Sequence, residues 1–588
     1  MKRTDFSVDW LFAACAPDTE LLPWNAQFTP VDLPHDWQIR HADDLYRDGT
    51  LFYRKYFFVT DVPGTRRMLW FGGAYMDTTV FVNGTEVGQW KYGYTSFWFD
   101  ITDALHEGQN EVLVRCNLRH PNSRWYSGAG LYRNVELWEA PDLHLMPDGL
   151  YVAAKEGDNG AWTVAVTAEA GSVTAASTGR TLTLHLTDDN GSLLGTAAIP
   201  ADAWAALPSP DGWRTGKETA IYKASHTFTL QDPALWDLDA PSFYHITAEL
   251  TGADGVTDTL TTRFGCRTIE ATPDCGLLVN HKRVLIKGVC IHHDFGCLGS
   301  AFEYSAAKRQ LEILKSMGVN SIRTGHTPPA PQFMDLADEM GILMDVESFD
   351  CWRSGKNPYD YGRFFDEWQE KDVASWIRRD RNHPSLLFWC IGNEIYDTHA
   401  GSEGADTMRM LLAEVAAHDP ARNGIPTLGS NYMPWENTQH CADIIKVAGY
   451  NYGERLYASH HEKHPDWVIY GSETSSIVQS RGIYHFPLSQ SLLSDDDLQC
   501  SSLGNSRTSW GAESWDVCLQ SEQRWPFTLG QYLWAGWDYI GEPTPYHTRS
   551  SYFGTIDTAG FPKDAYYVVQ AAWLDPKTHP CLLYTSDA

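Results

Sequence analysis

The chain has 588 residues, and at roughly 150 residues per domain this length predicts three or four domains. Its 45 lysines and arginines against 75 aspartates and glutamates give a net charge of −30 at pH 7, which is the wrong sign for a nucleic-acid partner. Hydrophobic residues at 43% and charged residues at 20% are ordinary for a folded protein and exclude disordered and fibrous classes.

The chain lacks the sequence features of membrane and secreted proteins. No stretch approaches the length of a spanning helix, roughly 18 consecutive apolar residues. The apolar run at residues 11–16 is too short for a signal peptide. The 12 cysteines contain no CxxC pair, which favours reduced thiols over a disulfide framework. We therefore expect no membrane partner and a cytoplasmic location.

The first half of the chain has the pattern of two β-sandwiches. From about residue 50 to 140, runs such as LFYRKYFFV and TTVFVNGTEVG alternate with turns rich in glycine, asparagine and aspartate, which predicts an antiparallel sandwich. A second set of runs, such as WTVAVTAEA and FYHITAEL, predicts a smaller sandwich that ends near residue 265. We place the domains at 1–140, 141–268 and 269–588.

After residue 276 strands alternate with amphipathic helices such as AAKRQLEILKSMG, which is typical of a parallel α/β domain. The predicted strands are at residues 284–289, 319–324, 342–347, 386–394, 425–430, 445–450, 468–473 and 531–538. Eight parallel strands in about 300 residues predict a TIM barrel, with a doubly wound sheet as the alternative.

Two glutamates end predicted barrel strands. Glu394 closes the fourth strand and Glu473 the seventh, so both should point into the mouth at the carboxyl ends of the strands. Two carboxylates that face one cleft are what glycoside hydrolysis requires, and a separation of about 5–5.5 Å would mean retention. The alternative for either glutamate alone is a structural salt bridge. Histidines after the first two strands and a tyrosine pair after the sixth support the catalytic interpretation.

At these strand ends the chain resembles glycoside hydrolase family 2, and most closely its bacterial β-galactosidases. The resemblance runs from residue 33 to about residue 573 and includes LPHDW (33–37), SGAGLYRNVEL (127–137), IKGVCIHHD (286–294), IRTGHTPPAP (322–331), RDRNHPSLLFWCIGNE (379–394), YGSE (470–473), GWDYIGEPTPY (536–546) and SSYFGTIDTAGFPKD (550–564). Family members usually continue into further β-domains, so we expect a C-terminally truncated chain whose residues 580–588 are a non-native tail.

The resemblance implies a multidomain protein with an N-terminal jelly roll, an immunoglobulin-like sandwich and a catalytic (β/α)8 TIM barrel. It also implies a retaining double displacement in which Glu394 is the acid/base and Glu473 is the nucleophile. By the same matching, Asn393 would hydrogen-bond the 2-hydroxyl of the sugar and Tyr450 would hold the nucleophile.

Further positions that match the family would complete the sugar subsite. They are His292, His326 and Trp534, which would line it, and Asp350, which would contact a sugar hydroxyl. The resemblance implies no cofactor. Some family members use Mg²⁺ near the site, but no residue set here supports a metal. The HHEKH run at 460–464 lacks the HExxH spacing, so a solvated helix face is the better interpretation.

The preferred substrate is a β-galactoside, and two alternatives stay open. Glucuronidases of this family usually carry an Asn-x-Lys pair, and residues 554–560 offer none, which favours a neutral hexose. A β-glucuronidase or galacturonidase would instead need a basic pocket, for which Arg323, Arg353 and Lys356 are the candidates. The other alternative is an inactive carbohydrate-binding fragment. The sequence also leaves a homo-oligomer open.

Overall fold

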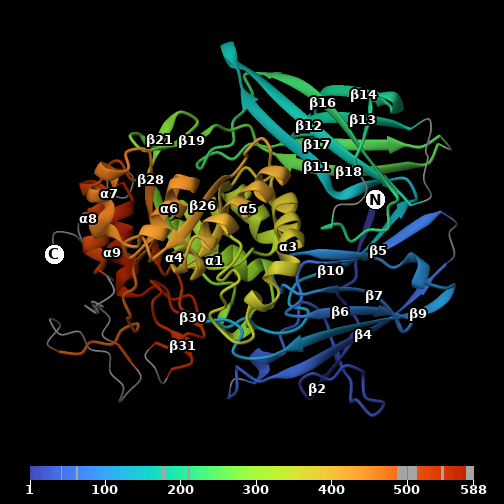
Figure 1. The fold of residues 1–588 in the computed structure, drawn as a ribbon, viewed down its shortest axis with the longest axis horizontal. Coiled ribbons are helices and arrows are strands. Elements are labelled where there is room, and N and C mark those ends of the chain that lie inside the picture. The colour runs from blue at the N-terminus through green and yellow to red at the C-terminus, as the bar shows by residue number, and fades with distance from the viewer. Residues whose placement is uncertain are drawn as a thin grey trace.

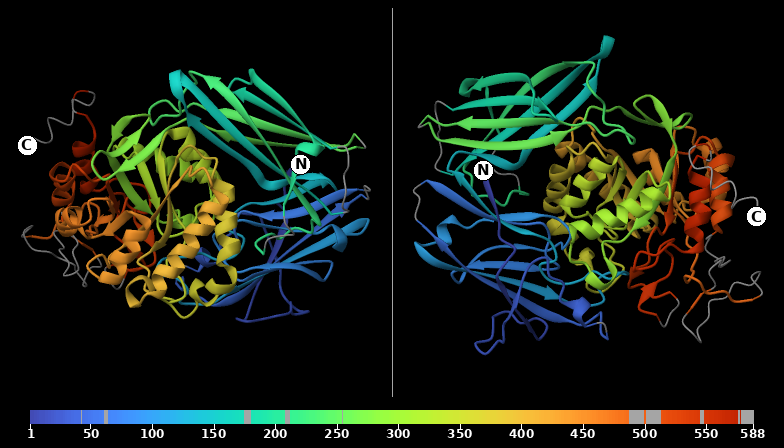
Figure 2. Two further views of the ribbon diagram at one scale, coloured as in Figure 1. Left: turned by 45° about the horizontal axis from the view of Figure 1, so that its top comes forward. Right: turned by 180° about the vertical axis from the view of Figure 1, so that it is seen from behind.

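The computed structural model describes the chain except residues 42, 61–63, 174–179, 208–211, 254, 487–498, 501–512, 545–547, 576 and 578–588. The expected tail at 580–588 and the end of the GWDYIGEPTPY stretch therefore lie outside the described residues. Figures 1 and 2 show two β-sandwiches side by side against one flank of a barrel, with α9 on the opposite flank.

The first sandwich packs two antiparallel sheets, with the strand orders β1-β10-β5-β8 and β3-β2-β4-β9-β6-β7. Its strands are β1 (Lys2–Asp5), β2 (Trp10–Cys15), β3 (Thr29–Val31), β4 (Gly49–Val59), β5 (Thr65–Phe71), β6 (Thr78–Val82), β7 (Thr85–Trp90), β8 (Phe97–Asp100), β9 (Gly108–Leu118) and β10 (Val135–Pro141). Alternate residues of β9 are buried, because one face of its sheet covers the core and the other faces outward.

The second sandwich also has two antiparallel sheets, ordered β11-β12-β16-β15 and β14-β13-β17-β18. Its strands are β11 (His144–Glu156), β12 (Ala161–Ser172), β13 (Thr181–Asp188), β14 (Leu193–Pro200), β15 (Ala205–Ala206), β16 (Ala220–Gln231), β17 (Tyr244–Thr251) and β18 (Thr257–Phe264). In β13 the three leucines at 182, 184 and 186 alternate with less buried residues, so their side chains fill the space between the sheets.

The third domain is a closed parallel barrel in which each strand pairs with the next and the last pairs with the first. Its strands are β22 (Ile286–Ile291), β23 (Ser321–Thr324), β24 (Leu343–Glu347), β25 (Leu386–Asn393), β26 (Ile425–Ser430), β27 (Val447–Asn451), β28 (Val468–Ser475) and β29 (Gly530–Trp534). The predicted fold class is confirmed. The eighth strand ends at Trp534 rather than at 538, because the backbone N–H groups of Ala535 and Asp538 bond to the carbonyls of Phe553 and Ile556 instead of continuing the barrel sheet.

Helices follow the barrel strands and cover the outside of the barrel. They are α1 (Tyr304–Ser316), α2 (Pro331–Met340), α3 (Phe365–Asp380), α4 (Asp397–Ala400), α5 (Glu403–His418), α6 (Glu436–Ile445), α7 (Tyr457–Lys463), α8 (Trp515–Arg524) and α9 (Asp564–Trp573). Since helices cover one side of each strand and side chains fill the barrel from the other, β25 is buried along its whole length.

Short strands connect the barrel to its neighbours. The sheet of β19 (Ile269–Thr272), β20 (Gly276–Val279) and β21 (Lys282–Val284) precedes the first barrel strand, and β30 (Tyr539–Ile540) pairs with β31 (Ser550–Ser551) after the last. A bridge between Trp125 and Gly541 joins a loop of the first sandwich to this second pair. The bridge brings residues from the N-terminal domain to the barrel mouth.

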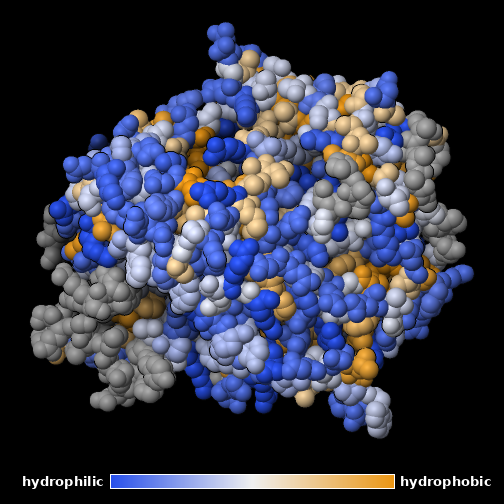
Figure 3. Space-filling model, in the orientation of Figure 1, coloured by the Kyte–Doolittle hydropathy of each residue, from blue (hydrophilic) through white to orange (hydrophobic). Residues whose placement is uncertain are grey.

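The surface shown in Figure 3 is largely hydrophilic, with apolar residues scattered among polar ones. No helix of the described residues combines the length and the hydropathy needed to cross a bilayer. One apolar core cluster continues from the first sandwich into the barrel, where the rings of Trp90 and Trp368 meet at 5.6 Å.

Candidate active site

Glu473 lies near the end of β28, and a donor holds each of its carboxylate oxygens. Arg323 Nη1 donates to Oε1 at 2.8 Å, and the Tyr452 hydroxyl donates to Oε2 at 2.7 Å. Burial raises the pKa of Glu473 to about 7, against the opposing effect of the Arg323 guanidinium. The two donors orient the carboxylate and stabilise its ionised form, which is the form a nucleophile needs.

The tyrosine that holds Glu473 is Tyr452, and the prediction of Tyr450 for this role is wrong. The Tyr450 hydroxyl hydrogen-bonds His460 Nδ1 at 2.9 Å, and its ring packs in a cluster with Trp467 outside the barrel lumen. Successive side chains of a strand point to opposite faces, so Tyr450 points outward from the end of β27. Tyr452 follows the strand with a φ of 54° and reaches the carboxylate from there.

Glu394 directly follows β25, where its backbone turns with a φ of 47°. Arg124 Nη1 donates to Oε2 at 3.2 Å and Asn451 Nδ2 donates to Oε1 at 3.1 Å. A positive φ is costly for a glutamate, and such strain is found where a side chain must be aimed at a site. The Glu394 side chain is 11% exposed and lies at the wall of a cavity.

Asn393 and Asp350 lie beneath this wall rather than on it. Asn393 is fully buried, donates from Nδ2 to Asp350 at 3.0 Å and accepts from Arg323 at 3.0 Å. Asp350 accepts from Arg124 at 2.7 Å and from Lys356 at 2.8 Å. Although burial raises the pKa of Asp350, these two cations lower it to about 2. A direct sugar contact by either residue stays a prediction.

Two of the three predicted subsite rings line the cavity. Trp534 and His326 stack with their centroids 5.3 Å apart, and burial lowers the pKa of His326 well below its ordinary value, which keeps the imidazole neutral. His326 Nε2 lies 3.7 Å from Glu473 Oε1. His292 sits behind them among the rings of Trp125 and Tyr539 and does not line the cavity.

The cavity has a volume of about 330 Å³, within the ordinary range of ligand sites. The described residues that line it are Arg124, Trp125, His326, Glu394, Asn431, Tyr452, Glu473, Ser476, Trp534, Glu542, Thr544 and Phe553. Both predicted catalytic carboxylates therefore face the same space. One is held by a buried arginine and a phenol, and the other by an amide and a more exposed arginine, so the two are placed for different roles.

Sequence reasoning assigned site roles to four of these twelve residues and missed the other eight, among them Arg124, Trp125 and Glu542. Arg124 and Trp125 come from the first sandwich, just before the SGAGLYRNVEL stretch, and no local pattern places that loop at the barrel mouth. Glu542 lies within the GEPTPY stretch, which marked the segment without assigning the carboxylate a role. Its side chain accepts a hydrogen bond from the Tyr539 hydroxyl at 2.5 Å.

The basic pocket that a uronate would need is not formed by the predicted residues. Arg323 is fully buried and pairs with Glu347 and Glu473. Arg353 pairs with Asp366 at 2.5 Å, and Lys356 forms an ion pair with Asp350 at 2.8 Å. Among the described residues, the basic side chain that lines the cavity is Arg124, which already contacts two carboxylates.

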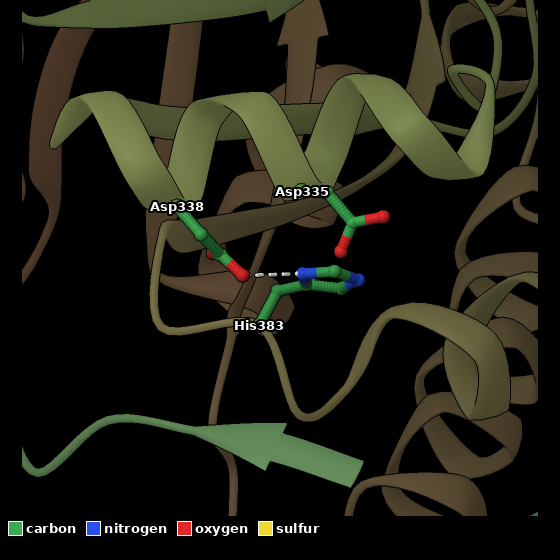
Figure 4. Close-up of side chains that lie close together, drawn as sticks. All are labelled: Asp335, Asp338 and His383. Atoms are coloured by element: carbon green, nitrogen blue, oxygen red, sulfur yellow. Dashed lines mark hydrogen bonds and ion pairs between the residues drawn. The ribbon is translucent and has the colours of Figure 1, made fainter. Parts of the chain in front are cut away.

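One group of three side chains in the described residues has the spacing of a metal site: Asp335, Asp338 and His383, shown in Figure 4. Arg263 of the second sandwich lies 3.3 Å from Asp335 and 3.2 Å from Asp338. Although burial lowers the pKa of His383, Asp338 raises it to about 9, so the imidazole carries a proton. A protonated imidazole and a guanidinium against the same carboxylates make this cluster an ion-pair network between domains.

Comparisons with known proteins agree with this architecture. Residues 148–267 match glycosyl hydrolases family 2, and residues 271–461 match the TIM barrel domain of that family. The β-galactosidase BoGH2A of Bacteroides ovatus is 34% identical over 98% of this chain and 72% of its own length. A β-glucuronidase of Bacteroides fragilis is 26% identical over 94% of this chain and 80% of its own length.

A solved structure, that of a β-glycosidase from Bacteroides vulgatus, superposes with a TM-score of 0.83 at 27% identity. The match covers 98% of this chain and 75% of that one. Across four curated relatives, the chain covers between 56% and 80% of the relative's own length.

Proposed function

Because the chain belongs to glycoside hydrolase family 2 and is a glycoside hydrolase, we propose that it is a retaining exo-β-galactosidase that acts on terminal β-D-galactosides. The observation that carries the proposal is that Glu394 and Glu473 line one cavity in different surroundings. The similarity to BoGH2A supports the choice of galactoside.

In the first step Glu473 attacks the anomeric carbon while Glu394 gives a proton to the leaving oxygen. The product of this step is a covalent glycosyl-enzyme in which Glu473 is esterified. Arg323 and Tyr452 hold the attacking oxygens in place, and the neutral ring of His326 lies beside them. The attack therefore needs Glu473 to be ionised before substrate is cleaved.

In the second step Glu394 acts as a base toward water, and the water displaces Glu473 from the sugar. This step needs Glu394 as a carboxylate. Arg124 Nη1 donates to Glu394 Oε2 at 3.2 Å and orients the side chain at the cavity wall. Arg124 and Lys356 also occupy the oxygens of Asp350, so we propose a reaction without a bound metal, in which these two cations balance the charge.

The charges around the cavity support a neutral sugar. Glu542 lies on the cavity wall with the two catalytic glutamates, and Arg124 is shared between Asp350 and Glu394. A uronate carboxylate would add a further negative charge to this set, and like charges at close range cost several kcal/mol, about 4 for a pair at 4 Å near a surface. The alternative substrate is a β-glucuronide, which the activity named for several relatives supports.

The test is hydrolysis of nitrophenyl β-galactoside, β-glucuronide and β-mannoside by the wild type, Glu473→Gln and Glu522→Gln, each with and without EDTA. We expect galactoside turnover that EDTA leaves unchanged and that Glu473→Gln lowers by about 10⁴-fold or more, since no nucleophile remains. Glu522→Gln is the matched control, because Glu522 is a half-buried glutamate on α8 that does not line the cavity.

Each other outcome changes the proposal in a defined way. Turnover of the glucuronide alone would keep the mechanism and replace the substrate. Near wild-type turnover in Glu473→Gln would remove Glu473 from the role of nucleophile. Binding of galactose without turnover of any substrate would favour the inactive carbohydrate-binding fragment.

A further inference from the structure

A second cavity, of about 460 Å³, lies between the second sandwich and the base of the barrel. It is lined by residues that precede β25 and β26, such as Arg381 and Arg422, together with β11 and the segment after β18. Glu394 follows the opposite end of β25, and eight strand residues span about 26 Å. The cavity is therefore separate from the site that holds the two catalytic glutamates.

The wall of this cavity is basic, although the whole chain carries a net charge of −30. Four lysines and arginines line it: Lys155, Arg267, Arg381 and Arg422. Two acids, Glu156 and Glu270, also line it, so these six groups sum to +2 (four minus two). His281 approaches both acids, at 2.5 Å from Glu156 and 3.8 Å from Glu270.

Neither of the two inner arginines forms a direct ion pair in the described part of the chain. Carboxylates farther away act on their charges: Asp338 and Asp419 on Arg267, and Glu169 and Asp148 on Arg381. Arg267 Nη2 donates to the backbone carbonyls of Leu386 and Asn423, and its Nη1 is buried with no hydrogen-bond partner. Arg381 is 4% exposed and donates to the carbonyls of His418 at 2.6 Å and Asp148 at 2.9 Å, while its Nε has no partner.

Burial without a carboxylate in direct contact is costly for a cation, and it changes the pKa values of both residues. Burial lowers the pKa of Arg267 to about 9, and burial lowers the pKa of Arg381 to about 9 as well. Buried guanidinium groups are ordinarily balanced by carboxylate or phosphate, whose oxygens match the planar fork of donors. Both arginines line the cavity, and neither has a carboxylate in direct contact among the described residues.

The outer rim adds two cations that are free to approach a ligand. Lys155 and Arg422 are exposed, and neither forms an ion pair with the residues that the structure describes. We propose that this cavity binds a small molecule through an oxyanion, a phosphate or a carboxylate group, with Arg267 and Arg381 at its inner wall and Lys155 and Arg422 at its rim. The bound anion would tie the second sandwich to the barrel, because the four residues come from both domains.

The test is calorimetric titration of the full chain with inorganic phosphate and, separately, with succinate, at low ionic strength. Neither probe is a sugar, so binding is read independently of the catalytic cavity. The variant is Lys155→Ala with Arg422→Ala, which leaves the buried arginines and their carbonyl contacts intact. The matched control is Lys308→Ala with Arg409→Ala, which removes the same charge from exposed positions, 53% and 60% exposed, on barrel helices.

We expect saturable binding of one probe to the wild type and to the control pair, and at least tenfold weaker binding to the Lys155/Arg422 pair. The bound probe should also raise the melting temperature of the wild type more than that of the variant. Binding of phosphate would indicate a phosphate-bearing ligand and binding of succinate a carboxylate. No saturable binding of either probe, or equal binding by the variant and the wild type, would overturn the proposal.

The same variants separate this inference from the proposed function. Lys155 and Arg422 have no contact with the catalytic cavity, so galactoside hydrolysis by the pair should equal that of the wild type. A chain that bound the anion and hydrolysed no galactoside would retain the anion site and lose only the proposed activity.

Discussion

The contrast between Tyr450 and Tyr452 shows how finely the nucleophile is placed. Both tyrosines lie at the end of β27 in the run Tyr450-Asn451-Tyr452, and the sequence alone does not decide which of them contacts Glu473. Only the second contacts the carboxylate, at 2.7 Å, because the strand ends between them and the chain turns into the mouth. The side chain of Asn451, between the two, contacts Glu394.

Replacement of Tyr452 by phenylalanine removes one of the two donors to Glu473. We expect kcat/KM for the galactoside to fall by about 10²-fold, the usual effect of losing one preorganised donor. Tyr450→Phe is the matched control and should lose less than about threefold. Steady-state kinetics of the two variants measure the difference, and a larger loss in Tyr450→Phe would return the role to that residue.

The pH dependence of activity follows from the burial of Glu473. Because its pKa is raised to about 7 and the attack needs the carboxylate, kcat/KM should fall as the pH drops below about 7, by roughly tenfold per pH unit. Tyr452→Phe should move this limb to higher pH, since a donor to the ionised form is lost. A wild-type profile that stays flat down to pH 5 would contradict this assignment of the acid limb.

At the scale of elements, the barrel places each reactive group by where its strand ends. The alternation of strands and helices predicts all eight strands, because their apolar runs are buried on both faces. The alternation places the end of the eighth strand wrongly, because Trp537 and Asp538 continue the aromatic and polar pattern of a strand. There the backbone of Asp538 bonds to Ile556, and Lys563, just before α9, donates to the Asp538 side chain at 2.6 Å.

This buried pair predicts a large effect on stability. Lys563 is 1% exposed and Asp538 is 6% exposed. Lys563→Met would leave a buried carboxylate without its partner, so we expect a loss of about 3–5 kcal/mol in the free energy of unfolding. Urea unfolding measures it, and the double variant with Asp538→Asn should recover part of the loss. A loss below about 1 kcal/mol in the single variant would argue that the pair does not hold the segment.

At the scale of the molecule, both sandwiches contribute to the barrel. The first supplies Arg124 to the catalytic cavity, and the second lines the basic cavity and is tied to α3 by the ion pair of Arg378 with Glu169, at 2.7 Å. Arg214 approaches the same carboxylate at 3.1 Å. The relative positions of the domains are therefore held by charged contacts as well as by the shared apolar core.

The ion pairs of Glu169 with Arg378 and Arg214 make the stability of the fold depend on pH in the acid range. Burial raises the pKa of Glu169, but the guanidinium groups of Arg378 and Arg214 outweigh this effect and lower the pKa from 4.5 to about 2. A lowered carboxyl pKa stabilises the fold above the unfolded value and is lost as the pH falls, so the contribution, about 3 kcal/mol, should disappear between about pH 5 and 2. Glu169→Gln should flatten this part of the stability curve, and an unchanged slope in thermal unfolding would contradict it.

Local patterns were sufficient for the elements and for the two glutamates. Glu394 and Glu473 could be recognised because a parallel barrel brings all its strand ends to one mouth, and because hydrolysis of a glycoside needs two carboxylates there. The family resemblance then assigned their roles. The predictions of the strands and of the two glutamates use only residues close together in the chain and a rule about where strand ends meet.

The partners of these glutamates depended on packing between distant parts of the chain. Arg124 is 270 residues away from Glu394, and it reaches the carboxylate only because the first sandwich docks on the barrel through the Trp125 bridge. The basic cavity exists only where the second sandwich meets the base of the barrel. No periodicity in the sequence encodes the relative placement of two domains, since that placement is decided by the complementary surfaces that form after each domain has folded.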